Sequence, residues 1–162
     1  MTSPNTESTP APHEPSAVTA EQFQQIVARG MGEAFSSFQM SVDAIHRGFV
    51  RLRLAADARH LRPGDTVAGP VLFTLADTAL FALVMSIEGP VPLAVTSDLS
   101  IRFLRRPPPG DLIGEARLLR RGRRLVVGEV ALLSVIAGGD GEGDEESLVA
   151  HATGSYAVPS TR

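Results

Sequence analysis

Cysteine is absent from this sequence of 162 residues, which excludes disulfide frameworks, thiolate nucleophiles and cysteine-ligated zinc or iron–sulfur centres. Lysine is absent too, because all 15 basic residues are arginine, and this excludes Schiff-base catalysis and a P-loop. An excess of positive charge is also lacking. The formal net charge is -3 and the isoelectric point is about 5.8, so we expect no nucleic-acid partner.

The N-terminus lacks the basic start and apolar core of a secretion signal, and we therefore expect a cytoplasmic protein. Residues 1–19 are rich in Pro, Ser and Thr and nearly free of large apolar side chains, which predicts a disordered tail. With 43% apolar residues, the chain has enough apolar surface for one core, so residues 20–159 are expected to form a single domain. Its first element is a short amphipathic helix that ends at Gly30 and Gly32.

Residues 69–87 form the longest apolar stretch, with Pro70 suited to the first turn of a helix. Such a helix must be buried on most of its faces. A membrane span is the alternative, because a helix of this length comes close to the ~30 Å thickness of the hydrocarbon layer. Asp77 in its middle, the lack of a flanking basic cluster and the strand-like neighbours argue against a span, so we expect no membrane association.

The segments around this helix alternate as strands do. The clearest is 95–103, where Val, Ser, Leu, Ile and Phe alternate with Thr, Asp, Ser and Arg. Loops are expected at 57–67 and 138–147, and further strands at 35–45, 48–55, 112–120, 124–136 and 148–157. This order predicts an α+β fold in which one antiparallel sheet curls around one long helix. Because the sheet covers only one side of the helix, we expect a twofold dimer to cover the other.

Asp77 is the only ionisable residue between Asp65 and Glu88, and it lies about two turns into the buried helix. A buried carboxylate without a partner is costly, which favours a functional role. The structural alternative is a carboxylate that bonds to Thr74 or Thr78 on its own helix, or one that reaches a solvent-filled groove of the dimer without a function.

Residues 68–77 (Ala-Gly-Pro-Val-Leu-Phe-Thr-Leu-Ala-Asp) resemble the H-G-G-x-x-x-x-L-A-D signature of the phenylacetate-pathway (PaaI-like) acyl-CoA thioesterases, and the strand at 95–104 follows at a fitting distance. The resemblance spans about residues 35–157. It implies a hotdog fold, a homodimer or a dimer of dimers (a homotetramer), and hydrolysis of an acyl-CoA thioester to free acid and CoA.

The resemblance also implies roles for particular residues. Asp77 is the general base or nucleophile, and the Gly69 N–H holds the thioester oxygen at the positive end of the helix. The Thr96 hydroxyl orients water or the carboxylate, with Ser97 beside it.

The chain departs from the family signature at three positions. Ala68 stands where the family has histidine, Pro70 where it has a second glycine, and Arg62 where it usually has asparagine. Loss of the histidine and the asparagine implies an altered polarisation of the thioester, a low activity or a different substrate. The departures leave a non-catalytic acyl-CoA-binding hotdog dimer as the alternative function. A hotdog dehydratase fits less well, because the motif supplies no histidine as acid or base.

Seven residues are expected to contact substrate: Ser97, Pro70 and Arg62 by their positions in the resemblance, and four others by the chemistry of their side chains. Phe73 and Phe81 suit an apolar wall for the acyl group, and Arg105 and Arg106 suit the phosphates of coenzyme A. A solvated rim of the sheet is the alternative reading of these arginines. No pair among the four histidines has metal-ligand spacing, so neither a metal nor a cofactor is expected.

Gly69 and Asp77 are eight residues apart on one helix, which separates them by roughly 12 Å along its axis. One carbonyl group cannot contact both, because the donor and the base must each lie within about 3 Å of the reacting atoms. We therefore expect the site to combine Gly69 of one protomer with Asp77 of the other.

Overall fold

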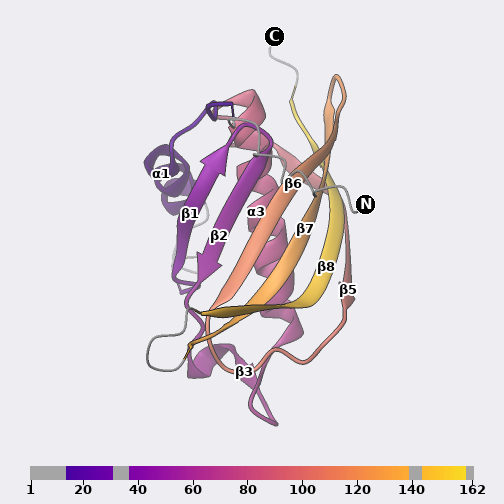
Figure 1. Cartoon of the computed structure of the whole chain (residues 1–162). Coiled ribbons are helices and arrows are strands. Elements are labelled where there is room, and N and C mark those ends of the chain that lie inside the picture. The colour runs from indigo at the N-terminus through magenta and orange to yellow at the C-terminus, as the bar shows by residue number, and fades with distance from the viewer. Residues whose placement is uncertain (1–13, 31–36, 139–143, 160–162) are drawn as a thin grey trace, which may run out of the picture.

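The computed structural model describes residues 14–30, 37–138 and 144–159, which form a sheet of six strands and a long helix packed against one face of it (Figure 1). The helices are α1 (Ala20–Gly30), the 3-10 turn η1 (Ala58–His60) and α3 (Gly69–Glu88). The strands are β1 (Met40–His46), β2 (Phe49–Leu54), β3 (Leu61–Arg62), β4 (Thr66–Val67), β5 (Val95–Phe103), β6 (Leu112–Arg121), β7 (Leu125–Ile136) and β8 (Glu145–Ala157).

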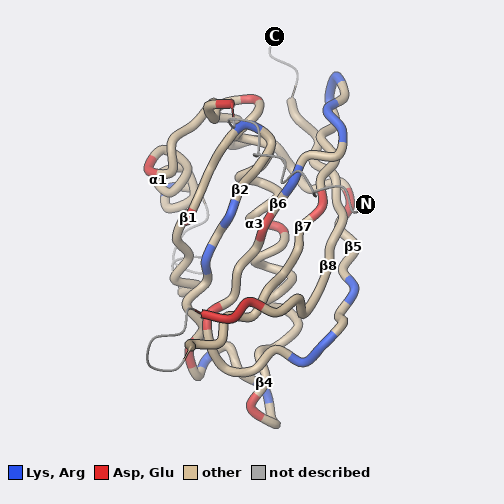
Figure 2. Tube along the Cα trace, viewed as in Figure 1, with Lys and Arg blue, Asp and Glu red and all other residues tan. Residues whose placement is uncertain are grey.

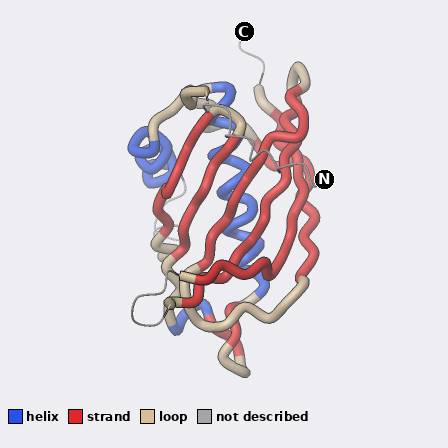
Figure 3. Tube along the Cα trace, in the orientation of Figure 1, coloured by secondary structure: helices blue, strands red, loops and turns tan. Residues whose placement is uncertain are grey.

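The strand order in the large sheet is β1-β2-β6-β7-β8-β5, and every neighbouring pair is antiparallel. Strands β1 and β5 are therefore the two edges. Figure 3 shows α3 lying across the strands on one side of the sheet, with α1 next to the β1 edge. The predicted α+β hotdog fold, one antiparallel sheet curled around one helix, is confirmed.

Helix α3 begins at Gly69 as predicted and ends at Glu88, where Gly89 follows with a positive φ of 82°. Of its apolar stretch 78% is buried inside the fold, so α3 is the core helix and the membrane alternative is wrong. One stripe of α3 near its N-terminal end is not fully buried. Pro70, Phe73, Thr74 and Asp77 recur at three- and four-residue spacing, and all four retain exposure to solvent in the single chain.

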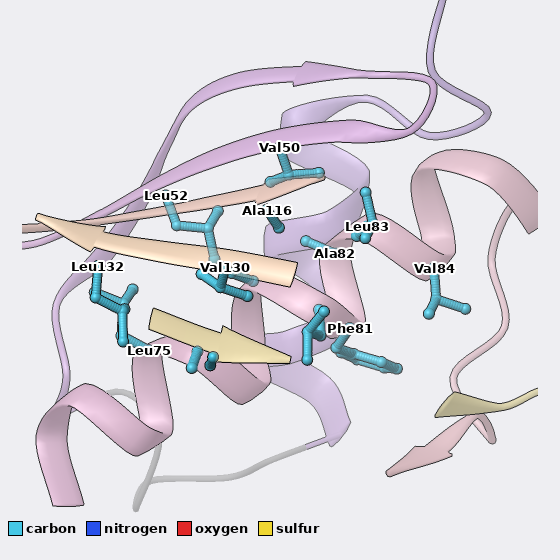
Figure 4. Close-up of a cluster of buried hydrophobic side chains, with 14 of the residues drawn as sticks. Val50, Leu52, Leu75, Phe81, Ala82, Leu83, Val84, Ala116, Val130 and Leu132 are labelled. Carbon is cyan, nitrogen blue, oxygen red and sulfur yellow. The ribbon is translucent and has the colours of Figure 1, made fainter. Parts of the chain in front are cut away.

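The core lies between α3 and the inner face of the sheet, where Leu75 and Leu83 of the helix meet side chains of β2 and β7 (Figure 4). Two glycines allow the helix to approach closely. Gly128 of β7 and Gly154 of β8 are paired in register. A Cβ on Gly128 would lie 2.6 Å from Leu83 Cδ2, and one on Gly154 would lie 2.8 Å from Leu80 Cδ1. A larger residue at either position would force Leu80 or Leu83 to change position in the packed core.

The N-terminal boundary differs from the prediction. Pro15 forms a β-bridge with His46, the Ala17 N–H donates to the Ser86 carbonyl at 2.9 Å, and Val18 is 2% exposed. Residues 14–19 therefore belong to the fold, and for them the predicted tail is wrong. Backbone hydrogen bonds and a single buried valine hold this segment in place. The tail is predicted from amino-acid composition, which is sensitive to neither of these contacts. Residues 1–13 lie outside the described residues.

Smaller differences concern strand ends and one loop. Strand β1 begins at Met40 rather than at residue 35, and β8 begins at Glu145 rather than at residue 148. Residues 35–36 and 139–143, which the predicted strand and acidic loop include, lie outside the described part of the chain. The predicted loop at 57–67 contains η1 and the small β3–β4 hairpin.

The β3–β4 region fixes the start of α3. The Ala68 N–H donates to the His60 carbonyl at 2.9 Å, and the Val67 N–H donates to the Pro107 carbonyl at 3.1 Å. The Thr66 hydroxyl donates to the same Pro107 carbonyl at 3.0 Å. These bonds hold the N-terminus of the helix against the loop that follows β5.

Candidate active site

Asp77 faces a cleft of about 420 Å³ between α1, α3, β5 and β8. Its Oδ1 accepts hydrogen bonds from Thr96 Oγ1 at 2.8 Å and from Tyr156 Oη at 2.7 Å. No donor of the described residues bonds to Oδ2. The carboxylate is thus neither sealed inside the protomer nor unpartnered: one oxygen is held and the other is free.

The structural reading of Asp77 as a partner of its helix neighbours is wrong. The Thr74 hydroxyl donates to the Pro70 carbonyl at 2.9 Å, and the Thr78 hydroxyl donates to the Thr74 carbonyl at 2.7 Å. Both hydroxyl protons are therefore used on the backbone, and the carboxylate turns to the sheet instead.

A β-bulge in β5 allows Thr96 to reach Asp77. Thr96 pairs with Tyr156 and Asp98 pairs with Ser155, so Ser97 is the extra residue. Without this bulge Thr96 would lie on the opposite face of the strand from Leu99 and Ile101, which pack on the core. The strict alternation predicted over 95–103 is therefore interrupted at Ser97. Ser97 itself is exposed and does not line the Asp77 cleft.

Tyr156 is a site residue that the sequence did not reveal. It lies on β8, 79 residues from Asp77, and only 4% of it is exposed. Its ring stacks on Phe81 with 5.8 Å between centroids. Phe81 in turn contacts Phe23 of α1 edge to face, at 6.2 Å between centroids. The one available signal is that Tyr156 is the only tyrosine of the chain.

Gly69 lies at the N-terminal end of α3 and does not line the Asp77 cleft. Ala68 caps the helix without a side-chain hydrogen bond, and Pro70 has no N–H to donate. The Val71 N–H donates to the Ala68 carbonyl at 3.0 Å. Within the described part of the chain, the Gly69 N–H has no acceptor, so it is the amide that remains for a ligand at this helix end.

The predicted substrate residues divide into two groups. Gly69, Pro70, Arg62, Arg105 and Arg106 line one cleft of about 540 Å³. A neighbouring hollow of about 480 Å³ contains Gly69, Pro70 and Phe73.

Phe81 belongs instead to the Asp77 cleft. Figure 2 shows basic residues where β5 ends and at the tip of the β6–β7 hairpin. The structure thus brings Arg62, Arg105 and Arg106 together beside the N-terminus of α3, and it places Asp77 in a different cleft.

The arginines of the β6–β7 hairpin lie apart from both clefts. Arg121 pairs with Glu88 at the end of α3, with Arg121 Nη2 donating to Glu88 Oε2 at 2.9 Å. No cluster of three or more His, Asp or Glu side chains suited to a metal ion occurs in the described ranges 14–30, 37–138 and 144–159.

Comparison with known sequences gives a consistent family. A profile of the thioesterase superfamily matches residues 64–135, which include α3 and β5. A candidate esterase of Halobacterium salinarum is 35% identical over 125 residues, which are 74% of this chain and 80% of that protein.

Solved structures give the same result. A candidate thioesterase of Silicibacter sp. TM1040 superposes with a TM-score of 0.70 at 37% identity, covering 90% of this chain and 94% of that chain. The PaaI protein of the E. coli phenylacetic acid degradation operon superposes with a TM-score of 0.69 at 21% identity, covering 88% of this chain and 97% of that chain. The second likeness bears on the fold alone.

Proposed function

Because the chain belongs to the hotdog-fold thioesterase superfamily, and is therefore a hydrolase of thioesters or esters, we propose that it hydrolyses an acyl-CoA to free acid and coenzyme A. In this proposal Asp77 is the general base or nucleophile. The observation that carries it is the carboxylate itself, whose Oδ1 accepts two hydrogen bonds while Oδ2, free of any described donor, is left for the reaction.

Both routes open to this carboxylate use Oδ2. In the first, Oδ2 takes a proton from water as the water oxygen bonds to the thioester carbon; the carbon–sulfur bond then breaks, and coenzyme A leaves as the thiol with that proton. In the second, Oδ2 bonds to that carbon, coenzyme A leaves as the thiolate, and water hydrolyses the mixed anhydride. Either route requires an electrostatic partner for the carbonyl oxygen, and the free Gly69 N–H at a helix N-terminus suits that purpose.

A homodimer brings these two groups together in the proposal. Asp77 and Gly69 of one chain line separate clefts, so one protomer holds two half-sites. The surface between them is apolar and uncovered: the exposed fractions are 41% for Phe73, 60% for Val95 and 55% for Phe103. Such a patch beside an unpaired sheet edge is the kind of surface that a second copy covers.

Coenzyme A fits the cleft next to Gly69. Arg62, Arg105 and Arg106 supply guanidinium groups that suit phosphate oxygens, and Phe103 and Leu104 supply an apolar wall. The Asp77 cleft contains Ile26, Phe81 and Pro92, which suit an apolar acyl group. The proposed substrate is thus an apolar acyl-CoA, with its phosphates at the arginines.

The test is thiol release from a panel of acyl-CoA chain lengths, measured with wild type and Asp77→Asn. We expect wild type to release thiol and Asp77→Asn to lower kcat by about a hundredfold or more. Asp65→Asn is the matched control, because Asp65 is an exposed turn residue at φ 49°, a conformation that asparagine tolerates. Its kcat should equal that of wild type.

The alternative function, an acyl-CoA-binding dimer without catalysis, is favoured by Ala68 and Pro70 in place of the family's histidine and second glycine. It predicts tight binding of acyl-CoA with no thiol release by any variant. Equal rates for wild type and Asp77→Asn would reject the role of Asp77. Specific activity that stays constant when the dimer is diluted into monomers would reject the shared site.

A further inference from the structure

We propose that Tyr156 is a positioning residue for this reaction: its hydroxyl, with that of Thr96, holds Oδ1 of Asp77 and so turns Oδ2 to the cleft. The inference rests on the proposed hydrolysis and adds to it a residue outside the matched family segment of 64–135. The two hydroxyl groups lie 2.7 Å and 2.8 Å from the same carboxylate oxygen.

Two donors on one oxygen restrict a torsion that is otherwise loose. The terminal χ2 torsion of aspartate is broad, so a carboxylate with one donor can rotate over a wide range of angles. Tyr156 approaches from β8 and Thr96 from β5. With both bonds made, rotation about χ2 breaks two hydrogen bonds together. Oδ2 then keeps one direction, and its lone pairs are free for water or the thioester carbon.

The sheet register places both hydroxyl groups on the helix side. Thr96 and Tyr156 are direct partners across the β5–β8 pair, so their side chains share one face. The bulge lies at Ser97, directly after Thr96 in the chain, and beyond it β5 alternates as an ordinary strand does. The bulge thus serves to point Thr96 at the oxygen that Tyr156 already holds.

The ring of Tyr156 is fixed independently of its hydroxyl. It is stacked on Phe81, with 25° between the ring planes, and Phe81 lies one helical turn after Asp77. A buried phenol needs one hydrogen-bond partner, and the Asp77 backbone carbonyl at 3.1 Å would meet that need. The phenol has only one proton, and its shorter distance to Asp77 Oδ1, 2.7 Å, indicates that it donates mainly to the carboxylate.

Tyr156 acts as a donor and not as a base. Burial raises the pKa of Tyr156 well above its ordinary value; a hydrogen bond with Thr96 opposes this, and the charge of Asp77 reinforces it. The phenol is therefore protonated throughout the neutral range, and its proton is available to Asp77 at every stage of the reaction.

The variant that tests the proposal is Tyr156→Phe, which keeps the stacked ring and removes only the hydroxyl. We expect kcat for acyl-CoA hydrolysis to fall about tenfold, as for a hydrogen bond to a charged group, while KM is unchanged. Thr78→Val is the matched control. Thr78 is a buried neighbour of Asp77 whose hydroxyl bonds only the Thr74 carbonyl, so its loss affects stability alone. A kcat for Tyr156→Phe equal to that of Thr78→Val overturns the proposal.

A double variant separates this inference from the proposed function. If the phenol acts through the carboxylate, Tyr156→Phe added to Asp77→Asn should not lower the residual rate further. A further tenfold loss in that background overturns the positioning role. Full activity of Asp77→Asn would instead reject the proposed function.

Crystal structures give a readout that does not depend on activity. In wild type we expect one orientation of the Asp77 carboxylate, with Oδ2 toward the cleft. In Tyr156→Phe we expect the carboxylate to be rotated or to occupy two orientations. A carboxylate that keeps its wild-type orientation without the phenol overturns the inference, whether or not the protein hydrolyses the substrates tested.

Discussion

Replacement of Gly154 by alanine tests how closely the central helix packs on the sheet. A Cβ at this position would lie 2.7 Å from the Asp98 carbonyl oxygen, 2.8 Å from Leu80 Cδ1 and 3.1 Å from Leu99 Cδ1. All three distances are shorter than the optimal ~3.5–4.0 Å between nonbonded carbon atoms. The Leu80 and Leu99 side chains have other rotamers, but the Asp98 oxygen belongs to the backbone of the neighbouring strand. The methyl group therefore forces β5 or β8 to shift.

Overpacking of this kind costs about 1–3 kcal/mol, and the backbone contact leads us to expect about 2 kcal/mol. For a chain of this length that corresponds to a fall in Tm of about 4–8 °C. Thermal unfolding followed by circular dichroism measures it. Gly30→Ala is the control, since nothing lies within 4 Å of its added Cβ. If Gly154→Ala had the same Tm as Gly30→Ala and wild type, the close packing of β8 at Gly154 against β5 and α3 would be wrong.

Three other changes test separate parts of the molecule. Phe73→Asp charges the uncovered stripe of α3, and should convert dimers to monomers in light scattering and abolish thiol release; an active monomer would contradict the shared site. The double change Arg105→Gln and Arg106→Gln should raise KM for acyl-CoA about tenfold or more and leave kcat unchanged, which steady-state kinetics would refute if KM stayed constant. Arg121 holds the pKa of Glu88 below its ordinary value. The ion pair therefore stabilises the fold above about pH 4.5, and this stabilisation is lost as the pH falls through the lowered pKa. Arg121→Gln should therefore lower Tm at pH 7, and lower it by progressively less as the pH falls below about 4.5.

The long elements of the fold were predictable because they carry strong periodic signals. The helix predicted at 69–87 is Gly69–Glu88, since a long apolar stretch between turn residues has no other stable conformation in a single-domain protein. The strand predicted at 95–103 is Val95–Phe103, because alternation over nine residues fits only a strand. Together they determine strand β5 and the helix that carries Asp77.

What the sequence did not reveal depends on register and on single contacts. The bulge at Ser97 changes which face Thr96 occupies, and one inserted residue leaves no mark on composition. Tyr156 reaches Asp77 because β8 lies beside β5, a neighbour relation set by the whole sheet. The pairing of Pro15 with His46 likewise involves backbone groups, which any residue type can supply.

Helix α1 and strand β8 both lie outside residues 64–135, and yet both contribute to the surroundings of Asp77. Phe23 of α1 supports Phe81, Phe81 supports Tyr156, and Tyr156 bonds Asp77 (in Figure 1, α1 and β8 lie on opposite sides of α3). If Asp77 is the catalytic carboxylate as proposed, homologues with the same helix motif can differ in turnover through the N- and C-terminal segments of their chains. Truncation of this chain to residues 64–135 would keep Asp77 and remove Phe23 and Tyr156.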